Sequence, residues 1–117
     1  YRHQCYETTR LVADYLELKP GTFSTSFQSR LAGDKWLDPY TDKTIENFAK
    51  TGTKDMAVVT PAFVSDCLET LEEIGIEAVE DFEDNGGENL HVVPCINDRE
   101  GWIKVLSRWI DEWAVAS

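Results

Sequence analysis

Two short apolar runs constrain the fold of this chain more than any other feature. They are "DMAVVTPAFV" (residues 55–64) and "LHVVPC" (90–95), and neither alternates regularly between polar and apolar residues. This pattern is typical of strands that are buried on both faces of a parallel sheet. Parallel neighbours need a long crossover, usually a helix. We therefore expect helical structure between the two runs.

The other segments extend this alternation of helices and strands. Phe alternates with small polar residues in "TFSTSFQS", which predicts a strand at 22–29, and Gly, Pro and Asp predict a loop at 30–42. Apolar residues at helical spacing predict helices at 4–16, 42–52, 65–74, 76–87 and 98–115. We therefore predict a single α/β domain over residues 1–117, with three layers. A central parallel sheet of about three to four strands would have helices on both faces.

The last predicted helix carries a row of large apolar side chains. Trp102, Leu106, Trp109 and Trp113 follow one another at helical spacing, so they share one face of the helix. A tryptophan row of this kind is more often packed in a core than used as a ligand platform. We expect this face to be buried.

Charge and cysteine content narrow the class of function. The chain has 11 Lys and Arg against 22 Asp and Glu, which disfavours binding to nucleic acid and favours cations. No apolar run approaches the roughly 20 residues that span a bilayer, so we expect no transmembrane segment. Cys5, Cys67 and Cys95 lie far apart, which indicates free thiols in a reducing compartment. The chain opens with Tyr1 within a helical pattern, and we expect it to be part of a longer protein.

The predicted helix at 65–74 gathers acidic residues within "FVSDCLETLEEIG". With Ser65 as N-cap and 100° per residue, Asp66, Glu69 and Glu73 fall on one face. The opposite, core-facing side would carry Cys67, Leu68, Leu71 and Ile74. On periodicity alone this is a solvated acidic face. However, the helix follows a buried strand, at the sheet edge where open α/β sheets bind ligands. If the acidic face is enclosed, repulsion and desolvation raise some of these carboxyl pKa values, which suits proton transfer near neutral pH.

Three stretches identify a family. "SFQSRLAGDKWLDPYTDKTI" (26–45), "VVTPAFVSDCLETLEEI" (58–74) and "VVPCIN" (92–97) together resemble the C-terminal half of bacterial-type ferrochelatase. This family inserts ferrous iron into protoporphyrin IX, the terminal step of haem biosynthesis. The resemblance implies a Rossmann-like, chelatase-type domain, a cytoplasmic location that includes peripheral association with a membrane, and Fe²⁺ as a substrate. It implies no tightly bound cofactor.

The resemblance also assigns roles to residues. The Glu of the S-D-x-x-E-T stretch, Glu69 here, is counted in the family as a metal ligand or proton acceptor that faces the porphyrin centre. Asp66 and Glu73 would continue an acidic trail for protons or metal. Trp36 and Phe63 match residues of the porphyrin-pocket wall. The implied catalytic residues are thus Asp66, Glu69 and Glu73.

Two departures and one absence accompany the resemblance. Cys67 stands where some ferrochelatases have His, and the chain lacks the C-terminal cysteines that hold a [2Fe–2S] cluster in some members. The family's catalytic His lies in a segment that would precede Tyr1. We therefore expect the N-terminal half of the same protein to be a partner, and this chain alone to be inactive.

Two alternatives remain open. A cobalt or nickel chelatase of a related tetrapyrrole pathway would share the fold, but such enzymes usually depend on histidine-rich sites, and this chain has only His3 and His91. A non-catalytic binding module could keep the fold and the acidic face. The intact S-D-x-x-E-T-L-x-E stretch favours the enzyme over the binding module.

Overall fold

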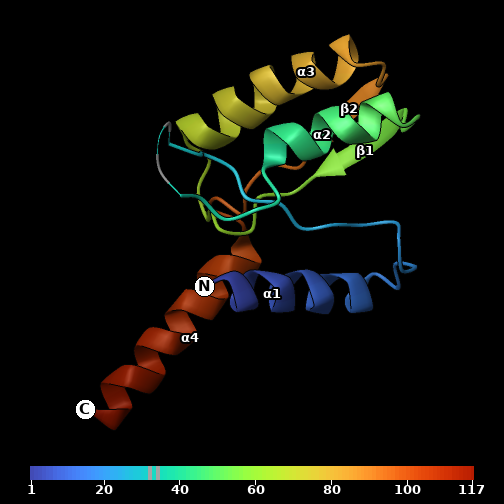
Figure 1. The fold of residues 1–117 in the computed structure, drawn as a ribbon. Coiled ribbons are helices and arrows are strands. Elements are labelled where there is room, and N and C mark those ends of the chain that lie inside the picture. The colour runs from blue at the N-terminus through green and yellow to red at the C-terminus, as the bar shows by residue number, and fades with distance from the viewer. Residues whose placement is uncertain (32, 34) are drawn as a thin grey trace.

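The computed structural model describes residues 1–31, 33 and 35–117 and has an α/β fold (Figure 1). The sequence prediction of this class is confirmed. Its elements are α1 (Arg2–Tyr15), α2 (Thr41–Lys50), β1 (Asp55–Val58), η1 (Glu69–Ala78), α3 (Val79–Asp84), β2 (Asn89–Val92) and α4 (Glu100–Ala116). Of these, η1 is a π-helix and runs directly into α3. The predicted helices at 65–74 and 76–87 are therefore one continuous helical stretch.

The sheet within the described residues has two strands. β1 and β2 pair in parallel, with Asp55 opposite Asn89 and Val58 opposite Val92. The η1–α3 stretch is the crossover between them, as the two apolar runs predicted. The predicted sheet of three to four strands is not found in the described part of the chain.

The segment at 22–29 is not a strand, contrary to prediction. It forms a single bridge, in which Phe27 N–H donates to the Pro39 carbonyl at 2.9 Å and Thr41 N–H donates to the Phe27 carbonyl at 3.1 Å. Ser29 has a φ of 61°, in the left-handed region, so the extended conformation stops there. The predicted loop at 30–42 ends at Tyr40, and its residues 32 and 34 lie outside the described residues.

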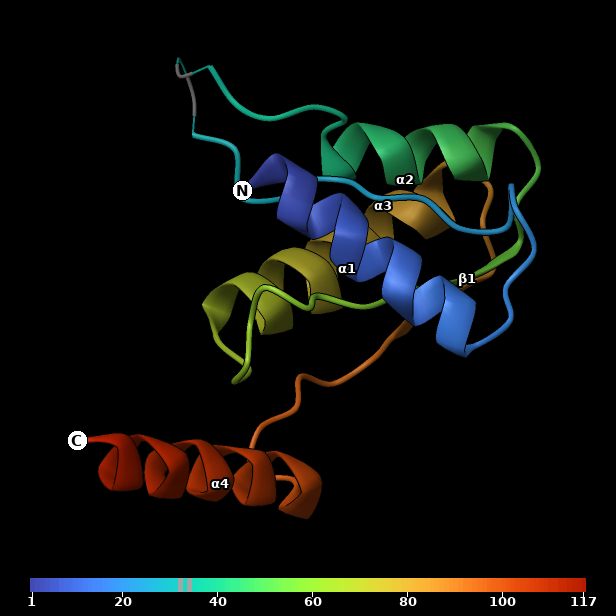
Figure 2. The same ribbon diagram turned by 90° about the horizontal axis from the view of Figure 1, so that it is seen from below.

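The first apolar run is a strand only at its start. β1 ends at Val58, and a turn follows in which Phe63 N–H donates to the Thr60 carbonyl at 3.0 Å. Within β1, exposed residues alternate with half-buried ones. In β2 the exposed Asn89 and His91 likewise alternate with the buried Leu90 and the half-buried Val92, so the prediction of strands buried on both faces is wrong for both strands. Helices α2 and α3 lie together on one side of the sheet, and α1 lies on the other side, next to the 22–29 segment (Figures 1 and 2).

The core lies between the sheet and the α2–α3 layer. Helix α2 contributes Ile45 and Ala49, β2 contributes Leu90, and the η1–α3 stretch contributes a row of buried side chains. That row is Thr70, Ile74, Ala78 and Phe82, spaced at intervals of four residues. A π-helix closes its hydrogen bonds over five residues and so turns more slowly than an α-helix, which suits a four-residue repeat on one face.

This repeat corrects the helical wheel drawn from the sequence. The regular helix begins near Glu69 and not at Ser65, so Asp66 precedes it. Thr70 is only 2% exposed, whereas Leu68 and Leu71, expected in the core, are 68% and 61% exposed. The wheel failed because it assumed 100° per residue from residue 66 onward.

Helix α4 projects away from the sheet and its helices (Figures 1 and 2). None of its residues is buried, and Trp109 and Trp113 are 52% and 70% exposed. The prediction that the tryptophan row packs in the core is therefore wrong for this chain. Within the described residues, none of the helices has the length and apolar character needed to cross a bilayer.

Candidate active site

Asp66 joins the connections that follow the two strands. Its backbone N–H donates to Asn97 Oδ1, and Asn97 Nδ2 donates back to Asp66 Oδ2, both at 2.8 Å. Thr70 Oγ1 donates to Asp66 Oδ1 at 2.9 Å. These hydrogen bonds, most strongly that of Asn97, lower the pKa of Asp66. Through these hydrogen bonds, Asp66 links the segment after β1 to the segment after β2.

Glu69 is the exposed carboxylate at the start of η1. The Cys67 thiol, and then the backbone N–H of Glu69 itself, lower the pKa of the Glu69 carboxyl by hydrogen bonding. Glu69 is therefore negatively charged at neutral pH. The expectation of raised pKa values is wrong for Asp66 and Glu69, because both are hydrogen-bonded near the surface instead of enclosed.

Glu73, four residues further along η1, is half-buried and bound to Ser29. The Ser29 N–H donates to Glu73 Oε1 at 2.6 Å, and the Ser29 hydroxyl donates to Glu73 Oε2 at 2.7 Å. Both carboxylate oxygens are thus occupied by one residue from a distant part of the chain. This two-point contact is the tightest side-chain link between η1 and the segment before α2.

Trp36 is joined to the same helix through Gln28. The indole Nε1–H of Trp36 donates to the Gln28 carbonyl, and Gln28 Nε2 donates to the Glu69 carbonyl, each at 3.0 Å. The half-buried Trp36 is thereby tied to the first turn of η1. Phe63 is half-buried in the turn after β1, on the same connection as Asp66.

The predicted site residues therefore come together on η1 and its flanking segments, but not as one acidic cluster. No hydrogen bond joins Asp66, Glu69 and Glu73 to one another among the described residues. Nor do the described residues, taken together, include a group of three or more His, Cys, Asp or Glu side chains that could bind a metal ion. A cation bound by Glu69 would therefore need further ligands besides the His, Cys, Asp and Glu side chains that the structure describes.

Sequence reasoning missed two residues that organise this site. Asn97 has a φ of 53° and Ser29 a φ of 61°. Asn97 Nδ2 donates to the Asp66 carboxylate, and the N–H and hydroxyl of Ser29 donate to the Glu73 carboxylate. Asn is frequent in the left-handed region, and Asn97 closes the "VVPCIN" motif, which was the available signal. Ser29 lies in the "SFQSRLAGDKWLDPYTDKTI" motif, but its partner Glu73 could not be read from the sequence, because it is 44 positions away.

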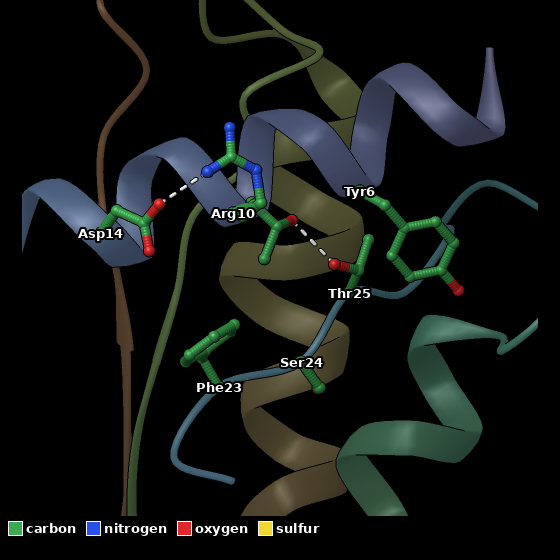
Figure 3. Close-up of a pocket in the computed structure, with 7 residues that line it drawn as sticks. Tyr6, Arg10, Asp14, Phe23, Ser24 and Thr25 are labelled. Carbon is green, nitrogen blue, oxygen red and sulfur yellow. Dashed lines mark hydrogen bonds and ion pairs between the residues drawn. The ribbon is translucent and has the colours of Figure 1, made fainter. Parts of the chain in front are cut away.

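One hollow of the described surface lies apart from the predicted site residues. It has a volume of about 390 Å³ and lies between α1 and the segment Phe23–Thr25 (Figure 3). Arg10 lines it, but its guanidinium is paired with Glu7 at 2.6 Å and with Asp14 at 2.7 Å. With its one cation neutralised and none of the predicted site residues in its lining, this hollow does not define the active site.

Comparison with known proteins identifies the family. The ferrochelatase family model matches residues 1–114. Proteins named ferrochelatase from Brucella anthropi and Brucella ovis are 53% and 52% identical to this chain over 106 residues. The alignments cover 91% of this chain and 30% of each relative, so the chain spans about 30% of the length of these curated relatives. The chain belongs to the ferrochelatase family.

Proposed function

We propose that the protein of which this chain forms part inserts Fe²⁺ into protoporphyrin IX and forms protohaem. The family match over residues 1–114 supports this activity. The single structural observation that carries it is the link between Trp36 and η1 through Gln28. This link holds an aromatic side chain suited to a porphyrin wall on the same framework as an ionised carboxylate suited to a metal.

Glu69 is the proposed reacting carboxylate. Its lowered pKa keeps it ionised at neutral pH, and a carboxylate oxygen holds Fe²⁺ weakly enough to release it again. A carboxylate whose pKa is lowered is a better cation ligand than a proton acceptor, so its main role is to hold iron before transfer. Asp66 and Glu73 contribute less directly, because Asn97 and Ser29, from distant parts of the chain, already bind their carboxylates.

The proposed porphyrin wall consists of Trp36 and Phe63. Metal insertion requires removal of two N–H protons from a flat macrocycle, and a wall that bends the ring would expose the nitrogen lone pairs. The hydrogen bond from Trp36 to Gln28 leaves the indole rings as an apolar surface of fixed orientation. No resident cofactor is proposed, and Fe²⁺ is a substrate.

The proposed partner of this chain is the N-terminal half of the same protein. Two observations support it: the curated relatives are longer, and α4 exposes the apolar row that includes Trp109 and Trp113. The remaining ligands of the iron, including a catalytic His, would come from that half. The free state of Cys5, Cys67 and Cys95 supports a reducing, cytoplasmic location, which includes the periphery of a membrane.

The test is Glu69→Gln in the full-length protein. We expect iron insertion to fall by roughly 10²-fold or more, while porphyrin binding stays within about twofold, because the substitution removes charge and keeps shape. Glu72→Gln is the matched control, since Glu72 is an exposed acid on the same helix. Near-normal turnover in Glu69→Gln would refute the assignment. Faster insertion of Co²⁺ or Ni²⁺ than of Fe²⁺ by the unmodified protein would refute the choice of metal.

A further inference from the structure

Glu73 is the meeting point of η1 and the segment that carries Trp36. Its two oxygens accept from the two donors of Ser29 at 2.6 and 2.7 Å. Hydrogen bonds to an ionised carboxylate are roughly twice as strong as neutral ones, and a two-point contact also fixes orientation. Glu73 is therefore placed to hold Ser29 in one position relative to the helix.

The backbone of Ser29 shows that this contact is specific. Its φ of 61° is a left-handed conformation that costs a non-glycine residue free energy. That conformation turns the N–H and the hydroxyl of Ser29 to the same carboxylate. The contacts with Glu73 offset the conformational cost, so loss of Glu73 would leave Ser29 with strain and without a partner.

Other contacts carry the effect of Ser29 to Trp36. The neighbouring Gln28 binds the Glu69 carbonyl and accepts the hydrogen bond of the Trp36 indole. On the far side of Ser29, the guanidinium of Arg30 lies 4.4 Å from the centre of the Tyr40 ring. Ser29 thus lies between the residue that orients Trp36 and a residue attached at the start of α2.

We propose that Glu73 is a positioning residue: through its two hydrogen bonds to Ser29, it holds the segment of Trp36 against the helix of Glu69. This proposal rests on the proposed function for its consequence, which is the correct placement of the porphyrin wall over the iron-holding carboxylate. It differs from a role in a trail for protons or metal, because the carboxylate of Glu73 acts here on a serine of its own chain.

The number of donors on Ser29 provides a sharp test. In Glu73→Gln, the amide carbonyl can still accept from the Ser29 N–H and the NH₂ group can donate to the Ser29 hydroxyl oxygen, so two charge-assisted hydrogen bonds become neutral ones. Ser29→Gly keeps the backbone N–H and suits a positive φ, but removes the hydroxyl. Glu73→Gln should therefore perturb the segment more when Ser29 is present, where two charge-assisted hydrogen bonds are weakened, than in the Ser29→Gly background, where only one is.

The first readout is amide hydrogen exchange of residues 27–31 in the full-length protein. We expect exchange to quicken roughly tenfold in Glu73→Gln, because two charge-assisted hydrogen bonds are replaced by weaker neutral ones. The increase should shrink severalfold in the Ser29→Gly background, and Glu72→Gln should leave exchange unchanged. Equal effects of Glu73→Gln in both backgrounds, or none in either, would overturn the proposal.

The second readout separates the two substrates. A positioning role predicts that Glu73→Gln raises the KM for porphyrin, leaves the KM for Fe²⁺ near its original value, and again has less effect in the Ser29→Gly background. A trail role predicts a raised KM for Fe²⁺ or a shifted pH profile whichever residue stands at position 29, and that result would overturn the proposal.

The two readouts also separate this proposal from the proposed function. Hydrogen exchange needs no turnover, so it tests the contact between Glu73 and Ser29 even in a protein that does not insert iron. If the unmodified full-length protein fails to metallate porphyrin while the exchange coupling is found, the proposed function fails and the positioning contact stands. If metallation is normal and the coupling is absent, the reverse holds.

Discussion

The packing of Phe82 against Gly87 gives a prediction whose magnitude follows from the structure. Phe82 is completely buried at the centre of the core that supports η1. Gly87, whose N–H donates to the Phe82 carbonyl at 2.8 Å, lies over the same ring. A Cβ added at Gly87 would overlap three atoms of that ring. A glycine is needed here for space rather than for a special φ.

Two substitutions and their combination test this packing. Gly87→Ala should destabilise the fold by about 1–3 kcal/mol, the usual cost of overpacking. Phe82→Ala should cost about 3–5 kcal/mol, because it leaves a cavity in a completely buried site. In the double variant the new methyl group has no ring to overlap. The double variant should be no less stable than Phe82→Ala alone, which gives a coupling energy of about 1–3 kcal/mol.

Urea denaturation of the four proteins measures these differences. Gly101→Ala is the control, because a Cβ at this position in α4 meets open space. There the substitution should stabilise the fold by up to about 1 kcal/mol, through helix propensity alone. Costs of Gly87→Ala and Phe82→Ala that simply add would refute the argument that the ring excludes the side chain.

Three further predictions concern the site and α4. Thr70→Val should destabilise the fold by roughly 1–3 kcal/mol in urea denaturation, because the buried hydroxyl that accepts the Cys67 N–H is lost, whereas Thr70→Ser should restore most of the stability. Asp66→Asn should weaken the dependence of the denaturation midpoint on acid: the folded pKa of Asp66 is lowered, so its stabilising contribution is complete above its ordinary value of 3.8 and disappears as the pH falls through the lower folded pKa. Trp113→Ala should change the free energy of unfolding of this isolated chain by no more than about 0.5 kcal/mol in the same assay, because its side chain is largely exposed.

Each of these has a contradicting result. Equal stability of the Val and Ser variants at Thr70 would mean that its hydroxyl does not support the start of η1. An unchanged acid dependence in Asp66→Asn would show that its hydrogen bonds are absent in solution. A loss of several kcal/mol in Trp113→Ala would show that α4 packs on the rest of the isolated chain.

Much of the site could be anticipated from local sequence. The run "SDCLETLEEI" placed Asp66, Glu69 and Glu73 on one connection, and the structure does place them between β1 and β2. Their mutual arrangement could not be anticipated, since it depends on a π-helix that begins only at Glu69. Helix type depends on small differences in backbone geometry that tertiary packing decides, and a periodicity argument assumes it in advance.

The predicted strand at 22–29 and the tryptophan row of α4 failed for a related reason. Alternation and helical spacing report which side chains prefer burial, but not whether a neighbour exists to cover them. Phe27 forms an isolated bridge with Tyr40, and the segment does not become a strand of the sheet. On α4, Trp109 and Trp113 find no covering layer within the described chain.

The sequence by itself determined the parallel strand–helix–strand unit and the family, because both rest on local runs of residues. Only the tertiary structure decided which hydrogen-bond partners the acidic side chains have. Asn97 lies 31 positions from Asp66, and Ser29 lies 44 positions from Glu73. Hydrogen bonds of such separation exist only after the chain has closed on itself. They bind the carboxylates of Asp66 and Glu73 to distant parts of the chain, whereas the donors to the Glu69 carboxylate, the Cys67 thiol and the Glu69 N–H, are local.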